Sequence, residues 1–207
     1  MLLSNRGIEE EIRFNGIIIN PYRAELIQPS SYDVTLSPEF KLQLACEPQD
    51  IDSCYIDPKV DNSAAFSDVF VPKGDDFVLY PGAFALGSTF ETIALGSNIT
   101  ARLEGKSSLG RLGLVIHATA GFIDPGFEGQ VTLELSNVGA MPILLTPGMR
   151  IGQLCFFKLP EPATIIYGTR FAGSHYQNQA GPTTSRSFER FKVYNAYPEV
   201  DTATKPL

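Results

Sequence analysis

The chain has 207 residues, 43% of them hydrophobic and 19% charged, which is typical of one globular domain with a sizeable core. Its formal net charge of -7 argues against a general nucleic-acid binder, which would present a basic face. The apolar runs are too short to cross a membrane, and the first residues, MLLSNRGIEEE, lack the apolar core of a signal peptide, so we expect a cytoplasmic protein. Cys46, Cys54 and Cys155 show no close pairing pattern, which predicts reduced thiols.

Hydrophobic periodicity predicts one short helix followed by many short strands. Ser4 or Asn5 would cap a helix over residues 6–14, in which Ile8 and Ile12 share a face. Strands are expected at residues 17–19, 32–36, 40–45, 77–79, 84–95, 99–103, 114–118, 131–135, 143–145 and 150–159. Pro-Gly turns separate several of them. This series predicts an all-β barrel or jelly roll.

Three segments lack this alternation. Residues 46–76 mix Pro, Asp, Ser and Asn with short apolar pieces, and we expect an extended excursion there. Residues 167–190 combine glycines, small polar residues and aromatics, which predicts a loop or an arm rather than core. Both a disordered segment and a lid that closes over a site fit this composition. Residues 191–207 are expected to form a flexible tail.

Most of the chemical information lies between residues 101 and 135. Lys106, Ser107, Ser108 and Arg111 supply cations and hydroxyls among glycines. This mixture suits phosphate, because small residues let backbone N–H groups approach the oxygens while the cations neutralise charge. The chain could alternatively expose Lys106 and Arg111 as solvated surface charges.

Two acidic residues and one histidine follow this cradle. Asp124 opens the turn Asp124-Pro125-Gly126-Phe127, which has the type II pattern, and could serve only as its acceptor. Glu134 points to the strand face opposite the leucines and could be either a functional carboxylate or a solvated strand glutamate. His117 lies on an apolar strand and fits a core or interface histidine better than a base.

Two more polar residues lie within apolar strands. Asp33 alternates with Tyr32 and Val34, and we expect its carboxylate to satisfy local backbone donors. Gln153 shares a face with Ile151 and Cys155 and is predicted to point inward, where a buried amide needs a partner.

Two motif assignments fail. Gly105-Lys106-Ser107 looks like the end of a P-loop, but Thr100 stands where that pattern needs glycine, and no helix pattern follows. A zinc nucleobase deaminase needs His-x-Glu with Pro-Cys-x-x-Cys, whereas this chain has only His117 and His175 and no Cys-x-x-Cys. We therefore expect no zinc, although a divalent cation could arrive with substrate phosphates.

Several blocks of the sequence resemble the dCTP deaminases of the dUTPase superfamily. They are residues 105–113 (GKSSLGRLG), 119–127 (TAGFIDPGF), 132–134 (TLE), 148–154 (GMRIGQL) and 174–179 (SHYQNQ). The resemblance covers most of residues 1–190 and implies one dUTPase-like domain there, a distorted β-barrel with a short N-terminal helix and a lid arm over residues 167–190. It also implies a homotrimer with active sites shared between subunits.

The resemblance implies roles for individual residues. Glu134 would be the general base and acid, taking a proton from water and passing it toward cytosine N3 and the departing ammonia. Ser107, Arg111 and the Ala120 carbonyl would hold that water and the charge state of Glu134, and Asp124 would meet the deoxyribose 3′-hydroxyl. The other implied substrate-binding residues are Lys106, Ser108, Leu109, Gly110, Thr132, Leu133, Gln153, Tyr167, His175 and Gln179.

Within this set, Lys106, Ser108, Arg111 and Gln153 would face the triphosphate, while Tyr167 and Gln179 would close from the arm. His175 departs from the family, since relatives commonly have lysine there. A neutral imidazole at that position would weaken phosphate capture at high pH.

Gly121 and Phe122 bear on the fate of the dUTP that deamination produces. Members with a bulky histidine at the position of Gly121 tend to release dUTP, whereas members with Gly-Phe resemble bifunctional enzymes that also cleave dUTP to dUMP and pyrophosphate. In that step Asp124 would orient water onto the α-phosphorus, while Mg²⁺ bound through the substrate phosphates neutralises charge.

Three alternatives to the bifunctional enzyme stay open. A single-activity dCTP deaminase would release dUTP, and a nucleotide-binding sensor would bind without turnover. A plain dUTPase usually has an apolar residue where this chain has Glu134. The resemblance also leaves open whether dTTP inhibits.

Overall fold

The computed structural model describes residues 1–46, 55–170 and 172–191. The chain divides into two compact units. One comprises Met1–Gln43 and Ser67–Thr183, and the other comprises Leu44–Phe66 and the described residues from Thr184 onward. All of the residues expected to form the site belong to the first unit. Most of the expected tail lies outside the described residues, which end at residue 191.

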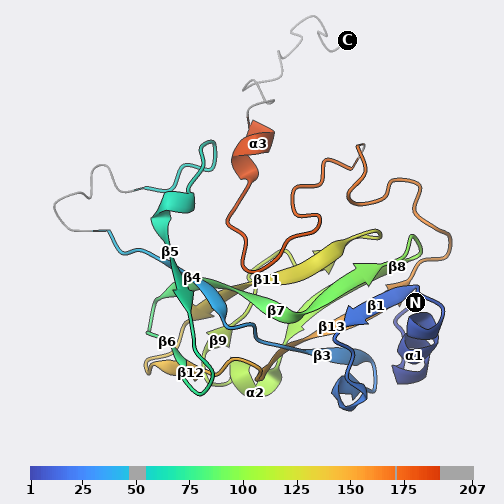
Figure 1. Cartoon of the computed structure of the whole chain (residues 1–207), viewed down its shortest axis with the longest axis horizontal. Coiled ribbons are helices and arrows are strands. Elements are labelled where there is room, and N and C mark those ends of the chain that lie inside the picture. Colours follow the sequence, from blue (N-terminus) through green and yellow to red (C-terminus); the bar gives the residue numbers. More distant parts are fainter. Residues whose placement is uncertain (47–54, 171, 192–207) are drawn as a thin grey trace, which may run out of the picture. The chain divides into compact units, whose positions relative to one another are not determined.

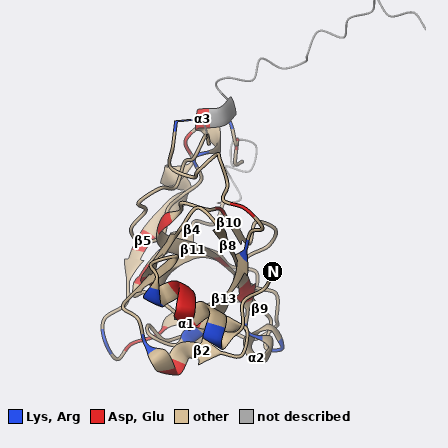
Figure 2. Cartoon of the chain, turned by 90° about the vertical axis from the view of Figure 1, so that its right-hand side faces the viewer, with Lys and Arg blue, Asp and Glu red and all other residues tan. Residues whose placement is uncertain are grey.

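The predicted N-terminal helix is present as α1 (Asn5–Arg13). Its N-cap is Ser4, whose hydroxyl accepts a hydrogen bond from the Gly7 N–H at 3.4 Å. Ile8 is buried, and acidic and basic positions lie side by side on the helix (Figure 2). The helix lies next to β1 (Ile17–Asn20), as Figure 1 shows. Its apolar side therefore anchors the start of the chain to the sheet beyond it.

The remaining secondary structure is almost entirely strand, as the sequence predicts. The strands after β1 are β2 (Ile27–Gln28), β3 (Ser31–Thr35), β4 (Glu39–Gln43), β5 (Phe66–Phe70), β6 (Phe77–Leu79), β7 (Phe84–Leu95), β8 (Ile99–Gly105), β9 (Leu114–Val115), β10 (Phe122–Ile123), β11 (Glu128–Asn137), β12 (Ile143–Leu145) and β13 (Arg150–Lys158). The short helical elements are η1 (Ala24–Leu26), η3 (Ser63–Ala65), α2 (Ser107–Gly110) and α3 (Ser187–Phe191). The predicted all-β class is confirmed.

Within the described residues the strands form three sheets. One has the order β5-β4-β7-β11-β9, with β1 also paired to β7, and a second has the order β10-β8-β13-β3-β2. A third pairs β12 with β6. Figure 1 shows the long strands β7 and β11 side by side. In the described part of the chain none of these sheets closes on itself, so the arrangement is of the jelly-roll type rather than a closed barrel.

The two larger sheets share one apolar core. Tyr32 and Phe156 from one sheet and Phe40 and Leu133 from the other are almost completely buried in the same cluster. Burying side chains of this size contributes about 1.5–3 kcal/mol each to folding. β3 is buried on both faces, although apolar and polar residues alternate along it.

The Pro-Gly turns are formed as the sequence predicts. Gly82, Gly126 and Gly148 have φ values of 76°, 89° and 87°, which is the left-handed region that a type II turn requires at its third position. In the turn that carries Asp124, the Phe127 N–H donates to the Asp124 carbonyl at 3.2 Å. These turns fix where β7, β11 and β13 begin.

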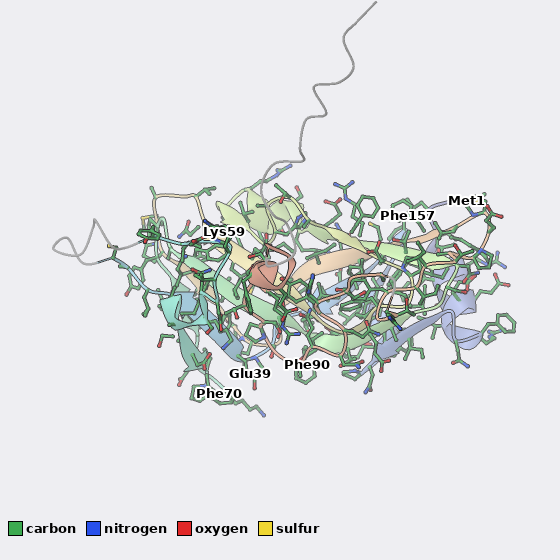
Figure 3. All side chains as sticks on the ribbon, turned by 90° about the horizontal axis from the view of Figure 1, so that it is seen from above. Met1, Glu39, Lys59, Phe70, Phe90 and Phe157 are labelled. Carbon is green, nitrogen blue, oxygen red and sulfur yellow. The ribbon has the colours of Figure 1, made fainter. Side chains whose placement is uncertain are left out.

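The first residues of the chain pair with the C-terminal end of β13. The Lys158 N–H donates to the Met1 carbonyl at 2.9 Å, and Leu2 forms an isolated bridge with Phe157. Figure 3 shows Met1 and Phe157 at the same end of the molecule. The Lys158 ammonium also lies 2.6 Å from a Glu11 carboxylate oxygen. This end of β13 is therefore tied to α1.

The second unit is small. Within it the Leu44 N–H donates to the Ala65 carbonyl at 2.9 Å, and the Ser187 hydroxyl donates to the Pro58 carbonyl at 2.8 Å. The segment expected to be an extended excursion, residues 46–76, thus contains η3 and all of β5, while its residues 47–54 lie outside the described part.

The cysteines do not all match the expectation of reduced thiols. Cys155 is free, but Cys46 is disulfide-bonded, so the prediction is wrong for Cys46. The reason is that a disulfide depends on the approach of two Cα atoms in space, not on a recognisable spacing. Cys54 lies outside the described residues.

Candidate active site

The expected phosphate cradle is one turn of helix at the end of β8. Lys106 occupies the N-cap position of α2, and its carbonyl accepts from the N–H groups of Leu109 and Gly110 at 2.9 Å. The expectation that no helix follows Gly105 is therefore wrong, because a single turn is too short to show apolar periodicity. Ser107, Ser108 and Arg111 are exposed. The cradle presents hydroxyls and a guanidinium outward.

A glycine ends this turn and fixes the next stretch of chain. Gly113 has a φ of 91°, and a Cβ there would lie 2.7 Å from the Gly139 backbone nitrogen. No side chain fits so close to a neighbouring backbone. The close approach holds the cradle against the loop after β11.

Asp33 differs from its expected role. Its side chain is only 1% exposed, and its carboxylate contacts the Lys106 ammonium at 2.7 Å and the Arg150 guanidinium at 3.4 Å. The predicted local backbone donors are not its partners, because β3 is buried and two distant cations reach it instead. Lys106 is thus held by a buried carboxylate rather than solvated.

Gln153 has partners at both ends of its amide. The Ser31 hydroxyl donates to its Oε1 at 2.7 Å, and its Nε2 donates to the Gly105 carbonyl at 3.3 Å. The expected shared face with Ile151 is wrong, because a β-bulge between Arg150 and Gly152 breaks the alternation. Ile151 is completely buried, whereas Gln153 is half-buried at the base of the cradle.

Glu134 is a half-buried carboxylate on β11. Its Oε2 accepts a hydrogen bond from the Ala118 N–H at 3.2 Å, and its own N–H donates to the Ile116 carbonyl at 2.8 Å. The flanking Leu133 and Leu135 are completely buried on the other face, as predicted. The loop that leads to Ala120, itself exposed, is therefore attached to Glu134 twice.

Gly121 lies where a side chain would not fit. Its carbonyl accepts from the Leu103 N–H at 2.8 Å, and a Cβ would lie 2.9 Å from the Leu103 carbonyl oxygen and 3.1 Å from His117 Cε1. The space beside Gly121 is thus occupied by β8 and the His117 ring. Phe122 is 67% exposed, with its ring 5.7 Å from the Arg102 guanidinium carbon.

His117 is half-buried and contributes to this packing, although the strand expected over residues 114–118 ends at Val115 and His117 lies in the loop after it. Its Nδ1 is buried, with no hydrogen-bond partner among the residues that the structure describes. A ring in this setting supports the Gly121 loop rather than facing open solvent.

The arm packs on the turn that carries Asp124. The Tyr167 N–H donates to the Pro125 carbonyl at 2.9 Å, and Gln177 Nε2 donates to the Gly126 carbonyl at 3.0 Å. Asp124 itself is exposed. The Tyr167 hydroxyl accepts from the Tyr176 N–H at 3.2 Å, which fixes the ring within the arm.

Further along, the arm lies against the start of β11. Gln179 forms a parallel bridge with Gly129, and its carbonyl accepts from the Gln130 N–H at 3.0 Å. The Thr132 hydroxyl lies 3.4 Å from Gln179 Oε1. Since Thr132 is two residues before Glu134, Gln179 reaches the strand face that bears Glu134. His175, earlier in the arm, is half-buried beside Tyr176.

The predicted residues therefore fall into two groups within one chain. The first group is connected through β11 and the arm and comprises Glu134, Thr132, Gln179, Tyr167 and the Asp124 turn. Lys106 and Gln153 belong to a second group with Asp33. Among the hydrogen bonds and ion pairs of the described residues, none joins Ser107, Ser108 or Arg111 to either carboxylate of the first group.

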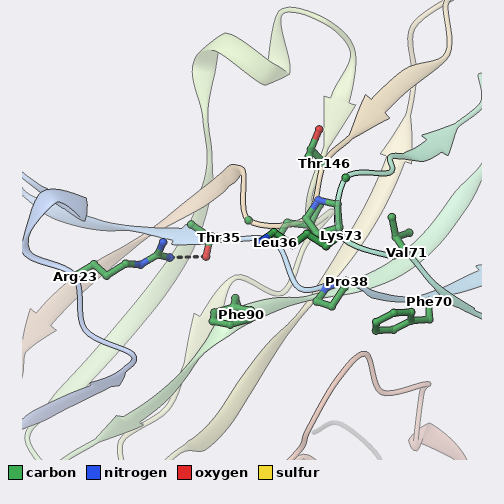
Figure 4. Close-up of a pocket in the computed structure, with 12 residues that line it drawn as sticks. Arg23, Thr35, Leu36, Pro38, Phe70, Val71, Lys73, Phe90 and Thr146 are labelled. Carbon is green, nitrogen blue, oxygen red and sulfur yellow. Dashed lines mark hydrogen bonds between the residues drawn. The ribbon is translucent and has the colours of Figure 1, made fainter.

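A cavity lies elsewhere in this unit. It has a volume of about 480 Å³ and is lined by residues that include Arg23, Leu36, Phe70, Lys73 and Phe90 (Figure 4). None of the predicted substrate-binding residues lines it. Beside it the Arg23 guanidinium lies 2.5 Å from the fully buried Glu91 carboxylate, which also accepts from the Thr35 N–H at 2.9 Å. Glu91 belongs to the buried interior, whereas the Arg23 side chain is 35% exposed.

The described part of the chain contains no group of three or more His, Cys, Asp or Glu side chains that could hold a metal ion. It also contains no helix long and apolar enough to span a membrane.

Comparison with known proteins identifies the family of this chain. A family model described as "dCTP deaminase-like" matches residues 2–159, and the chain belongs to this family. A relative from Salinispora arenicola named "dCTP deaminase, dUMP-forming" is 50% identical over 194 residues, 94% of this chain and 98% of the relative. A relative of the same name from Beutenbergia cavernae is 53% identical over 191 residues, 92% of this chain and 97% of the relative.

A solved structure has the same fold. The 2′-deoxycytidine 5′-triphosphate deaminase from Agrobacterium tumefaciens superposes with a TM-score of 0.57 at 23% identity. The match covers 75% of this chain and 47% of that one. At this identity the likeness supports the fold alone.

Proposed function

We propose that this protein converts dCTP to dUMP, ammonia and pyrophosphate in one active site. The observation that carries the proposal is the half-buried Glu134 carboxylate, bound to the Ala118 N–H beside the tightly packed Gly121 loop. Relatives named dUMP-forming are about half identical over almost the whole chain. A carboxylate so placed suits general acid–base work.

In the first step Glu134 takes a proton from a water molecule that attacks C4 of cytosine. Glu134 passes this proton to N3 and then takes the second proton from the hydroxyl group now on C4. It gives that proton to the amino nitrogen, so the C4–N bond breaks, ammonia leaves and the C4=O bond of uracil forms. Ser107, Arg111 and the Ala120 carbonyl hold the water and the charge state of Glu134. Thr132 and the backbone of Leu133 lie on the same strand and contact the substrate there, while the Leu133 side chain is buried on the other face.

In the second step a water molecule attacks the α-phosphorus of the bound dUTP. The bond from that phosphorus to the α–β bridging oxygen breaks, so that pyrophosphate leaves and dUMP remains. Asp124 orients the water and meets the 3′-hydroxyl. The cations and small residues of the 106–111 cradle would hold the substrate phosphates together with the Mg²⁺ bound to them, and Mg²⁺ would neutralise the phosphate charge.

The triphosphate lies against the α2 cradle. Its oxygens contact the side chains of Lys106, Ser108 and Arg111 and the backbone of Leu109 and Gly110. Gln153, which donates to the Gly105 carbonyl at the base of the cradle, also helps to hold the phosphates. Tyr167, His175 and Gln179 close over the nucleotide from the arm. Phe122 and Gly121 shape the loop between the base and Asp124.

The protein is proposed to be a homotrimer with shared sites. The support is that Ser107, Ser108 and Arg111 are exposed and, in the described residues of one chain, have no hydrogen bond or ion pair with Glu134 or Asp124. A neighbouring subunit would bring the two groups together. We place this enzyme in the cytoplasm, with the deoxynucleotide pool. dTTP, which shares the sugar and triphosphate, would compete for the site.

The proposal is tested by giving the purified protein dCTP and Mg²⁺ and separating the products by ion-exchange chromatography. We expect dUMP with little free dUTP. Products limited to dUTP and ammonia, with added dUTP left intact, would identify a single-activity deaminase. Hydrolysis of dUTP with dCTP untouched would identify a dUTPase, and binding without turnover would identify a sensor.

A further inference from the structure

The β-bulge in β13 changes which side chains share a face. In a regular strand, residues three apart point to opposite faces. Here Arg150 stands opposite Thr35 and Gln153 stands opposite Asp33, so three steps on β13 match two steps on β3. The extra residue in the bulge brings Arg150 and Gln153 to the same side of the sheet.

On that side Arg150 meets the buried anchor of the phosphate cradle. Asp33 Oδ1 lies 2.7 Å from Lys106 Nζ, and Asp33 Oδ2 lies 3.4 Å from Arg150 NH1. A buried carboxylate is stable only when it is paired, so Asp33 holds both cations in place. Two cations around one carboxylate leave a net positive charge at the surface.

The Arg150 guanidinium keeps donors free for a ligand. Its side chain is 48% exposed, and its other contact in the described residues is a hydrogen bond from NH2 to the Glu25 carbonyl at 3.4 Å. Guanidinium has five N–H donors in a planar fork, and both of these contacts are long. The Arg150 guanidinium is therefore held in one orientation while some of its N–H donors stay available to a ligand.

We propose that Arg150 is a third cation of the triphosphate site and that Asp33 is the positioning residue that aims Arg150 and Lys106 at the same phosphates. The inference rests on the proposed function, since it assigns a further substrate contact to that site. Gln153 donates to the Gly105 carbonyl at the base of the cradle. Because Arg150 and Gln153 lie on the same face of the sheet, Arg150 lies on the face that carries the cradle.

Binding of inorganic tripolyphosphate and of dCTP, measured by calorimetry, tests the proposal. The dCTP arm uses the Glu134→Gln background, so that no turnover intervenes. Arg150→Gln should weaken both ligands about 10- to 100-fold, because it removes a charge-assisted contact to phosphate. Binding of deoxycytidine should not change, because that ligand has no phosphate.

Lys158→Gln is the matched control. Lys158 lies on the same strand, is 50% exposed and is paired with one carboxylate, yet it stands about 26 Å from Arg150 along the strand. Its removal should leave tripolyphosphate and dCTP binding unchanged. An equal loss from both variants would overturn the proposal, because it would show only a general effect of net charge.

A double-mutant cycle tests the positioning role. If Asp33 aims Arg150, the Arg150→Gln loss should shrink to a few-fold in an Asp33→Asn background. Full additivity would refute the role of Asp33. Unchanged tripolyphosphate binding by Arg150→Gln alone would refute the phosphate contact, even if Asp33→Asn does not fold. Failure of the proposed function would look different, because wild-type protein would then form no dUMP from dCTP, whatever the effect of Arg150→Gln on tripolyphosphate binding.

Discussion

The side chain of Glu134 accepts a hydrogen bond from the Ala118 backbone at 3.2 Å, so the carboxylate and the loop that ends at Gly121 are one mechanical unit. The backbone of Glu134 is joined to the same loop, through the Ile116 carbonyl at 2.8 Å. A change in the loop therefore reaches the carboxylate directly. This coupling connects the deamination chemistry with the residues that bear on the second step.

Replacing Glu134 with glutamine should abolish most deamination while leaving substrate binding intact. The amide keeps the shape and an oxygen for the Ala118 N–H, but it cannot accept the proton from water. General acid–base catalysis is worth about 10²- to 10⁴-fold, so ammonia release from dCTP should fall by that order. Glu128→Gln, an exposed position on the same strand, is the control. Near-normal ammonia release from Glu134→Gln would assign Glu134 to the solvated strand face.

A side chain at Gly121 should affect pyrophosphate release more than deamination. A Cβ would lie 2.9 Å from the Leu103 carbonyl oxygen, so the loop must move, and displacements near 1 Å can cost about 10²-fold. The movement would shift the chain toward Asp124, three residues later. Gly121→His, and to a lesser degree Gly121→Ala, should therefore accumulate dUTP from dCTP. Gly7→Ala, which changes a remote glycine on α1, is the control and should leave the ratio of dUTP to dUMP unchanged. An unchanged ratio in Gly121→His as well would contradict this account of the loop.

Two inactive variants should restore activity when mixed. Arg111→Ala and Glu134→Gln each remove one half of a site that we propose to be shared between subunits. Trimers assembled from both chains, by joint refolding or coexpression, should contain some sites with both halves intact. Light scattering should give the mass of a trimer. Full activity from a monomer, or mixed trimers that stay inactive, would argue for a site within one chain.

Cys155 should be a slow nucleophile near neutral pH. Burial raises the pKa of its thiol above the ordinary value of 9.0, and the nearby Glu104 carboxylate raises that pKa further, while Arg102 opposes the shift. The neutral Cys155 thiol therefore makes its full contribution to the free energy of unfolding below about pH 9. That contribution is lost as the pH rises through the pKa of the thiol in the folded protein. Alkylation of Cys155 by iodoacetamide, followed by peptide mass spectrometry, should be slower than that of a free thiol at pH 8. Glu104→Gln should accelerate it, and an unchanged rate would contradict this electrostatic cause.

The sequence predicts the long strands well because their signals are local. β7 and β12 have the predicted bounds, since strict turn residues flank clear apolar patterns. β10 has two residues and α2 has one turn, which is too short for any period to appear. Local pattern therefore predicts the framework but not its smallest connecting elements.

The site is predictable in its residue types but not in its contacts. Asp33 meets Lys106 and Arg150 from positions 73 and 117 residues away, and no local rule reveals such partners. The orientation of Gln153 depends on a bulge that alternation alone cannot show. Arg150 is the residue that sequence reasoning misses, although it lies in the same short block as Gln153.

The central claim is that one bound nucleotide passes through both reactions, and an isotope-trapping experiment tests it most directly. Protein is mixed with labelled dCTP and Mg²⁺ in the presence of a large excess of unlabelled dUTP, and the products are separated after about one turnover. We predict that the label appears in dUMP despite the excess of unlabelled dUTP, because dUTP formed at the site is cleaved before it leaves. Label that accumulates in free dUTP, with none in dUMP, would contradict a single site for both steps.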